Sequence, residues 1–425
     1  MPSSTSSFES ASVESARLEP AGPDPVLFDA LAATRPGFVR PTASDRPGVA
    51  QPVPERDIPQ RPWPRIFAVA MILTLGAIGV WEWRMRALGL EAGDLGDGAS
   101  AWAEQRRRID AGNVAVAIVG DSRILFDTDL DRFEQLTGQR PVQLALPGTN
   151  ARPFLEHLAD EPRFTGLAIV GIADTSYFRD AAGLHVDAIE RYRFESPSSR
   201  GSFLTHRVLS RAFAFLDDNY RLSKLVRQLD EDWRAGTTMS VPERAWKFVV
   251  FRDGRQASLW PRIESDLRVR EHQRAVWRLN APGADKPIAD EVIARTQEKT
   301  RAAVEKIRAR GGEVVFLRPP SAPQYRAVED KRLPRTRGWD ALLAAAHVTG
   351  VHADEMPVAR ALSHSRALPE YSHLTRGCAT VYTDAYVRAL ARLTPRLALR
   401  ADAPPPLRAE DCATAGSAQA IVDRR

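Results

Sequence analysis

Residues 114–123, VAVAIVGDSR, combine a continuous apolar run rich in β-branched side chains with a glycine, an aspartate and a serine. The run lies between Gly112 and Gly120 and does not alternate polar with apolar residues, which is typical of a strand buried on both faces. Strands of this kind occur in parallel sheets whose two faces are covered by helices. The sequence therefore predicts an α/β domain built around this strand.

The chain after this strand repeats the alternation of buried strand and amphipathic helix. Strands are predicted at Val114–Val119, Gln143–Leu146, Leu167–Ile172, Glu313–Leu317 and Val348–His352. This order predicts a three-layer α/β/α domain with a doubly wound, flavodoxin-like parallel sheet over residues 112–400. The alternation stops between residues 180 and 287, where we expect a helical insertion with helices such as Phe203–Arg227. The Pro-rich segment 401–425 is predicted to be a disordered tail.

A second apolar run lies nearer the N-terminus. Residues 1–64 contain 12 of the 31 prolines and show no periodicity, which predicts a disordered tail. Ile66–Trp81 follows, with 16 residues and no charge. We interpret residues 65–84 as a transmembrane anchor lengthened by tryptophans at its edges, and residues 85–111 as a juxtamembrane helix. A buried core helix is the alternative, and a cleaved signal peptide is disfavoured because no small-residue cleavage site follows.

Basic residues flank this run unequally. Arg46, Arg56, Arg61 and Arg65 precede it, whereas only Arg84 and Arg86 follow, among several acidic residues. By the positive-inside tendency, the N-terminal tail stays in the cytoplasm and the remainder of the chain is exported. The predicted location is the inner (cytoplasmic) membrane, with a single pass and a periplasmic C-terminal domain.

Composition excludes several classes of function. The formal charge of +5 is spread along the chain, and no RRM, KH or zinc-finger pattern is present, so no nucleic-acid partner is predicted. Two cysteines, Cys378 and Cys412, exclude a disulfide framework and a multi-cysteine metal site. No metal and no other cofactor is predicted. Because Cys412 lies in the Pro-rich tail, we expect two unbridged thiols.

Ser122 is the first candidate for chemistry, because ligands bind at the carboxyl edge of open α/β sheets. His373 is the favoured base among eight histidines, since its loop after the last strand opens on the same edge. Glu370, three positions earlier, can orient the imidazole. Arg123 is a candidate for binding an anionic substrate, with an exposed helix arginine as the competing interpretation. For the turn at Gly120–Ser122, the competing interpretation is an ordinary helix cap.

These residues resemble the motifs of the SGNH (GDSL-type) hydrolases and acyltransferases. Gly120–Ser122 is similar to the block that supplies the nucleophile, Gly148 to the oxyanion glycine of the second block, and Glu370–His373 to the Asp-x-x-His of the last. The resemblance covers roughly residues 112–180 and 288–393. It implies Ser122 as nucleophile, His373 as base, Glu370 as its partner, and the amides of Ser122 and Gly148 as oxyanion donors.

The third block of that family, Gly-x-Asn-Asp, aligns with Gly171–Asp174, so Ala173 stands where the family has its oxyanion asparagine. Asn150 is the candidate to replace this donor. The acid is also glutamate where the family has aspartate. A non-catalytic descendant of the family is therefore kept as an alternative.

The anchor and the insertion resemble the membrane-tethered members that act on envelope polymers. This resemblance implies a serine esterase or O-acyltransferase whose partners are an acylated cell-envelope polysaccharide, an acyl donor and an acyl-donating integral membrane protein. The alternative is a catalytically silent scaffold or polysaccharide-binding subunit of an envelope assembly.

Overall fold

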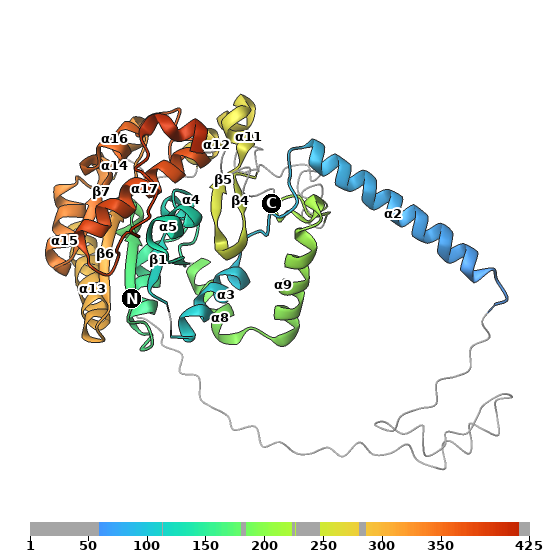
Figure 1. Cartoon of the computed structure of the whole chain (residues 1–425), viewed down its shortest axis with the longest axis horizontal. Helices are drawn as coiled ribbons and strands as arrows, with labels where there is room; N and C mark the ends of the chain where they lie inside the picture. The colour runs from blue at the N-terminus through green and yellow to red at the C-terminus, as the bar shows by residue number, and fades with distance from the viewer. Residues whose placement is uncertain are drawn as a thin grey trace, which may run out of the picture. The chain divides into compact units, whose positions relative to one another are not determined.

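The computed structural model describes residues 59–112, 114–179, 184–222, 226, 247–279 and 286–415. The predicted tail at residues 1–64 lies outside these ranges, except for its last six residues. The chain divides into two units, Met1–Ile72 and Leu73–Arg425. The second unit contains an α/β domain with a parallel sheet (Figure 1).

Five parallel strands form the sheet, in the order β2-β1-β3-β6-β7. They are β1 (Val116–Gly120), β2 (Val142–Gln143), β3 (Leu167–Gly171), β6 (Glu313–Arg318) and β7 (Thr349–His352). This strand order is that of a doubly wound sheet. The chain adds β2 on one side of β1 and then adds β3, β6 and β7 on the other side, so the order reverses between β1 and β3. The predicted parallel sheet is confirmed. Only β2 is clearly shorter than expected, although Leu144 and Leu146 still donate backbone hydrogen bonds to β1.

Alternate side chains of each strand enter two separate cores. Val116 and Ile118 of β1 pack in one core, together with α4 (Ser122–Phe126), α5 (Leu130–Thr137), α16 (Pro357–Ala361) and α17 (Arg376–Leu393). Ala117 and Val119 pack in the other, together with α3 (Ala99–Asp110), α6 (Ala151–Ala159), α13 (Asp290–Ala309) and α15 (Ala341–Ala346). Helices therefore cover both faces, as an apolar run without alternation requires.

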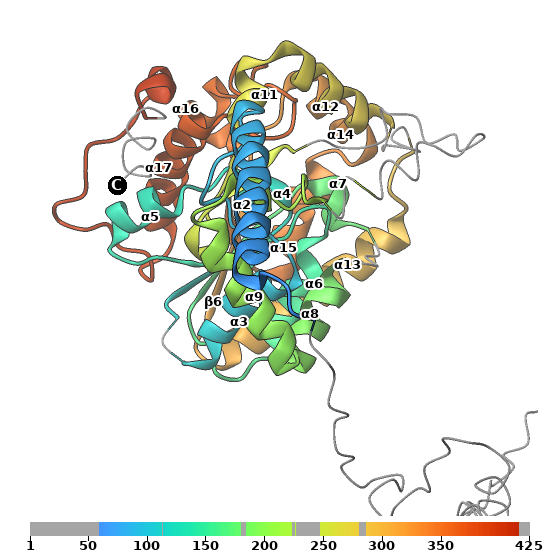
Figure 2. The ribbon, with the colours of Figure 1, turned by 90° about the vertical axis from the view of Figure 1, so that its right-hand side faces the viewer.

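The insertion contains both helices and a β-hairpin. Its described residues form, among other elements, α8 (Leu184–Phe194), α9 (Pro197–Ser210), η2 (Ala214–Leu216), the antiparallel β4 (Val249–Phe251) and β5 (Ala257–Leu259), α11 (Pro261–Ser265) and α12 (Leu267–Leu279). In two views α8 and α9 lie beside α3 (Figure 1, Figure 2). The sequence did not predict the hairpin. The helix predicted at Phe203–Arg227 is wrong beyond Ser210, where α9 ends, and the amides of Ala214 and Phe215 donate to Glu82 instead. Residues 223–225 and 227 of that prediction lie outside the described residues.

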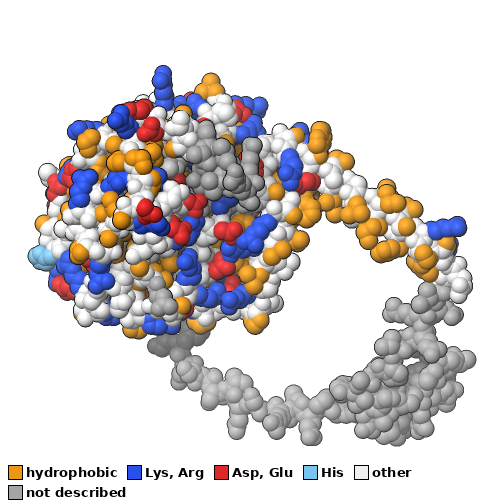
Figure 3. Space-filling model, viewed as in Figure 1, with side chains coloured by type: hydrophobic (Ala, Val, Ile, Leu, Met, Phe, Trp, Pro, Cys, Tyr) orange, Lys and Arg blue, Asp and Glu red, His pale blue; other side chains and the backbone are white. Residues whose placement is uncertain are grey.

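The apolar run forms α2 (Trp63–Ala87), whose 25 residues are long and apolar enough to cross a membrane. Hydrophobic side chains cover much of this helix, whereas charged side chains are scattered over the domain (Figure 3). The juxtamembrane helix predicted at residues 85–111 is wrong over its first half. Gly89, Gly93 and Gly96 all have positive φ angles there, which a helix does not accept. The helical residues of this range are the end of α2, up to Ala87, and α3.

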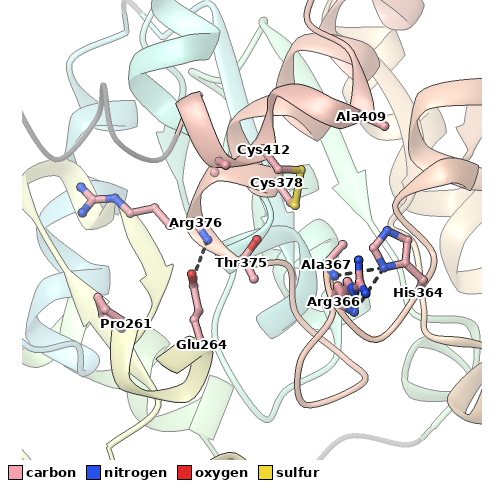
Figure 4. Close-up of a pocket in the computed structure, with 12 residues that line it drawn as sticks. Pro261, Glu264, His364, Arg366, Ala367, Thr375, Arg376, Cys378, Ala409 and Cys412 are labelled. Carbon is pink, nitrogen blue, oxygen red and sulfur yellow. Dashed lines mark hydrogen bonds between the residues drawn. A yellow bond between two sulfur atoms is a disulfide. The ribbon is translucent and has the colours of Figure 1, made fainter. Parts of the chain in front are cut away.

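The C-terminal segment is not a disordered tail over its described part. Leu407 donates its amide to Asp384 over 3.1 Å, and the carbonyl of Pro405 accepts from Arg132 over 3.1 Å. These contacts bring Cys412 to the start of α17, where it forms a disulfide with Cys378 (Figure 4). The expectation of two unbridged thiols is therefore wrong. Residues 416–425 of the predicted tail lie outside the described residues.

Candidate active site

Ser122, His373 and Glu370 form a continuous hydrogen-bonded chain. The Nε2 atom of His373 lies 2.9 Å from the Oγ atom of Ser122, and its Nδ1 atom lies 2.8 Å from Oε1 of Glu370. His373 and Glu370 are buried, at 1% and 0% exposure, whereas Ser122 is partly exposed. The structure thus brings together the three residues that the sequence singled out, with Ser122 as the partly exposed end of the chain of hydrogen bonds.

Two glycines allow Ser122 to begin a helix directly at the strand ends. Gly120 of β1 pairs in register with Gly171 of β3. A Cβ atom on Gly120 would lie 2.1 Å from Cγ2 of Ile124, and one on Gly171 would lie 2.3 Å from Cβ of Ile124. Asp121 caps the helix, accepting from the amide of Arg123 over 3.0 Å. Ser122 therefore sits where the strand order reverses, the usual ligand position in doubly wound sheets.

The loop that carries His373 is shaped by Glu370 and by a strained residue. Oε1 of Glu370 accepts from the backbone amide of His373 over 2.5 Å, in addition to its contact with the imidazole. Tyr371 has a φ of 77°, which is uncommon for a non-glycine residue. Its carbonyl accepts from the amide of Ala322 over 3.2 Å. Such strain persists where surrounding contacts hold the backbone, and it is frequent at functional sites.

The insertion contributes to this loop. The ring of Phe248 lies 6.3 Å from that of His373, and Phe126 of α4 lies 4.5 Å away. Arg274 of α12 donates its Nε to the carbonyl of Pro369 over 2.7 Å, and its guanidinium lies 4.3 Å from the centre of the Tyr371 ring. Sequence reasoning missed these contacts. Of these contacts, only that of Phe126 could have been predicted from the sequence, because Phe126 lies four positions after Ser122 in the same helix.

A further carboxyl group, Asp127, lies close to the imidazole. Its Oδ1 accepts from the amide of Leu374 over 2.8 Å, and Oδ2 has no hydrogen-bond partner among the described residues. Burial raises the pKa of Asp127 to about 7, and the charge of His373 and the Leu374 amide only partly oppose this effect. Asp127 thus changes charge near neutral pH beside the candidate base. Asp127 was not among the candidates predicted from the sequence.

The residues considered as oxyanion donors differ in how the structure places them. Gly148 has a φ of 69° in the turn after β2, and the amide of Ser122 is one of the first of α4, which have no partner within the helix. The Asn150 side chain caps α6, and its Nδ2 donates to the carbonyls of Tyr177 and Arg179 over 3.2 and 2.6 Å. Asn150 therefore ties two loops together, and both of its amide hydrogens are engaged. Ala173 is buried and supplies no side-chain donor.

Arg123 does not face a substrate, and it is not an exposed helix residue. It is 3% exposed, and its guanidinium binds Glu329 and the hydroxyl of Ser321. Glu329 also binds Arg318 over 2.6 Å. Although burial alone would raise the pKa of Glu329, the two arginines lower it to about 2. Arg123 therefore belongs to a buried ionic cluster, and the substrate-binding role expected for it does not fit this position.

The described residues contain no group of three or more His, Cys, Asp or Glu side chains that could hold a metal ion. Comparison of the chain with models of known protein families and with curated proteins finds no match. The site joins a partly exposed serine, a buried imidazole and a buried carboxylate by hydrogen bonds, in that order. This arrangement is the one that activates a serine nucleophile.

Proposed function

We propose that this protein is a serine esterase or O-acyltransferase of the SGNH type. One observation carries the proposal: the hydrogen-bonded chain from Ser122 through His373 to Glu370 at the carboxyl edge of a doubly wound sheet. Each residue supports the next, since Glu370 selects the tautomer in which Nδ1 carries hydrogen and Nε2 is free to accept the serine proton. The proposed substrate is an acylated cell-envelope polysaccharide or an acyl donor for one.

In the first half-reaction, Oγ of Ser122 attacks the acyl carbonyl carbon while Nε2 of His373 takes its proton. The imidazolium is stabilised by Glu370, and the amides of Ser122 and Gly148 stabilise the oxyanion. The intermediate collapses when His373 returns the proton to the departing oxygen, leaving the acyl group on Ser122. Water or a sugar hydroxyl then gives its proton to His373 and attacks the acyl carbon. As the bond between the acyl carbon and Oγ breaks, His373 passes this proton to Oγ, which releases the acid or ester product and restores both residues.

We infer that α2 anchors the domain in the inner membrane, with the domain on the periplasmic side. The length and apolar character of α2 support the anchor, and the excess of arginines before it supports the orientation. The Cys378–Cys412 disulfide also supports export, because stable disulfides are typical of compartments outside the cytoplasm. An acyl-donating integral membrane protein is the partner proposed for the transferase reaction. Alkaline phosphatase fused after Arg425 should be active, and an inactive fusion would refute the orientation.

A catalytically silent scaffold is the second candidate. It is favoured by Ala173, which stands where the family places a donor, and by the engagement of both amide hydrogens of Asn150 elsewhere. Loss of one oxyanion donor typically costs about a hundred- to a thousandfold in rate. The two functions therefore differ in whether Ser122 reacts at all.

Treatment with a fluorophosphonate, followed by mass spectrometry of intact protein and peptides, tests the proposal. We expect one adduct, on Ser122, which is lost in Ser122→Ala and in His373→Ala but kept in Ser265→Ala, a control at an exposed serine. Absence of the adduct in folded wild-type protein would favour the scaffold. Polymer acylation in cells that carry Ser122→Ala then tests whether the reactive serine is required for function.

A further inference from the structure

The C-terminal end of α2 is built into the insertion. The carboxylate of Glu82 accepts from the backbone amides of Ala214 and Phe215, both over 3.0 Å. Three residues later, Met85 is 3% exposed and packs in a core with Trp260 and other apolar residues of the insertion. The helix end and the insertion are therefore one packed unit, with no flexible linker between them.

An apolar hollow lies beside this contact. It has a volume of about 540 Å³, and its lining is mostly hydrophobic. The helix supplies Ala77, Ile78 and Trp81, and the insertion supplies His206, Phe215, Leu216, Arg221 and Leu222. The same part of the insertion exposes large apolar side chains to solvent: Leu204, Val208, Leu209 and Leu222, with Leu222 at 63% exposure. Exposed apolar side chains gathered near an apolar hollow are typical of an interaction site.

The occupant of this hollow can be inferred from the place of its lining residues along α2. Ile78 lies one helical turn before Glu82, roughly 6 Å further into the apolar run at 1.5 Å per residue. Leu216 and Leu222 line the hollow together with Ile78, so they lie near this level of the helix. If α2 spans the bilayer, side chains at this level lie at the boundary between headgroups and acyl chains. The hollow therefore opens where lipid tails begin.

We propose that the insertion surface formed by α9, η2 and Leu222 is a second membrane contact, and that phospholipid acyl chains of the periplasmic leaflet fill the hollow. This inference rests on the membrane anchor of the proposed function. Transfer of an apolar side chain from water to the acyl boundary lowers its free energy. This stabilisation accounts for the Leu and Val side chains exposed on this surface. Two contacts, unlike one flexible tether, hold the domain at a defined orientation to the membrane.

Spin labels on the full-length chain test the inference. The Cys378–Cys412 disulfide leaves no free thiol, so an introduced cysteine is labelled alone. Three variants are compared in phospholipid nanodiscs: Leu222→Cys on the insertion, Leu73→Cys on the span as benchmark, and Leu393→Cys on α17 as control. All three side chains are exposed, at 63%, 68% and 43%, so labelling leaves the core intact. Collision of each label with oxygen and with a water-soluble nickel chelate is measured by power saturation.

Labels at 73 and 222 should collide several-fold more with oxygen than with nickel, and the label at 393 should show the reverse. If 73 is in lipid but 222 behaves like 393, the second contact is refuted and the anchor stands. If 73 itself is exposed to nickel, the anchor is refuted. A label at 222 shielded from both reagents would mean that protein fills the hollow, which overturns the lipid occupant.

Discussion

The Nε2 atom of His373 lies 2.9 Å from the Oγ atom of Ser122, although 251 positions separate the two residues. The distance depends on contacts made by neighbours of both residues. Glu370 holds the imidazole and its backbone, Asp127 at the end of α4 holds the next amide, and Arg274 holds the start of the loop. Each contact can be removed separately, with a different expected result.

Glu370→Gln should slow fluorophosphonate labelling of Ser122 by about a hundred- to ten-thousandfold, because an amide stabilises neither the required tautomer nor the imidazolium. The measurement is the pseudo-first-order labelling rate, together with a melting curve that shows intact folding. Glu305→Gln, at an exposed ion pair with Arg301, is the control and should label at the wild-type rate. Equal rates for the two variants would remove Glu370 from the mechanism.

Arg274→Ala should slow labelling by about tenfold to a hundredfold, since it removes one hydrogen bond and one cation–π contact, each about 1 kcal/mol, from the His373 loop. Arg268→Ala is the control in the same helix, at an exposed side chain. Arg274→Lys should recover part of the rate, because a lysine keeps the charge over the Tyr371 ring. A melting point that falls in Arg274→Ala without any change in labelling would indicate a purely structural role.

Asp127→Asn should change the pH dependence of stability. The pKa of Asp127 is raised to about 7 in the folded protein, so the folded state binds more protons than the unfolded state between about pH 4 and pH 7. The free energy of unfolding of the wild type therefore falls as pH rises through this window. Asparagine cannot ionise, so this contribution to the slope should be absent from the variant. At pH 8 the free energy of unfolding of the variant should exceed that of the wild type by at most about 4 kcal/mol. Unfolding curves from pH 4 to pH 8 measure the difference, and identical slopes would contradict the prediction.

Glu329→Gln should destabilise the fold by about 3–5 kcal/mol, because Arg123 and Arg318 remain buried and lose the carboxylate that both of them bind. Their positions make the cost large, since Arg318 is 0% exposed and Arg123 only 3%. Glu305→Gln again serves as the control and should cost less than about 1 kcal/mol, as is usual for an exposed pair. Equal melting points for the two variants would show that the buried cluster contributes nothing to stability.

Several features could be predicted from the sequence because they depend on neighbouring residues. The uninterrupted apolar runs of β1, β3 and β6 indicate burial on both faces, and that requirement leads to a parallel sheet covered by helices. The length of the apolar run in α2 indicates a helix able to cross a membrane. Ser122 could be assigned to the carboxyl edge for the same reason, because its position follows directly from the end of β1.

Contacts between distant segments decided the rest. Arg123 is adjacent to Ser122 in sequence, yet it is buried because Glu329, 206 positions later, neutralises it. Both amide hydrogens of Asn150 are directed to a loop that begins 27 positions away. The pairing of Cys378 with Cys412 depends on a C-terminal segment that packs against α17, and Phe248 and Arg274 reach the His373 loop only through the folded insertion. The sequence by itself determined the strands of the parallel sheet, a helix long and apolar enough to cross a membrane, and the edge at which Ser122 lies, since local burial patterns specify them. Only the tertiary structure decided which side chains meet Ser122 there, because that depends on charges and packing surfaces brought together from distant parts of the chain.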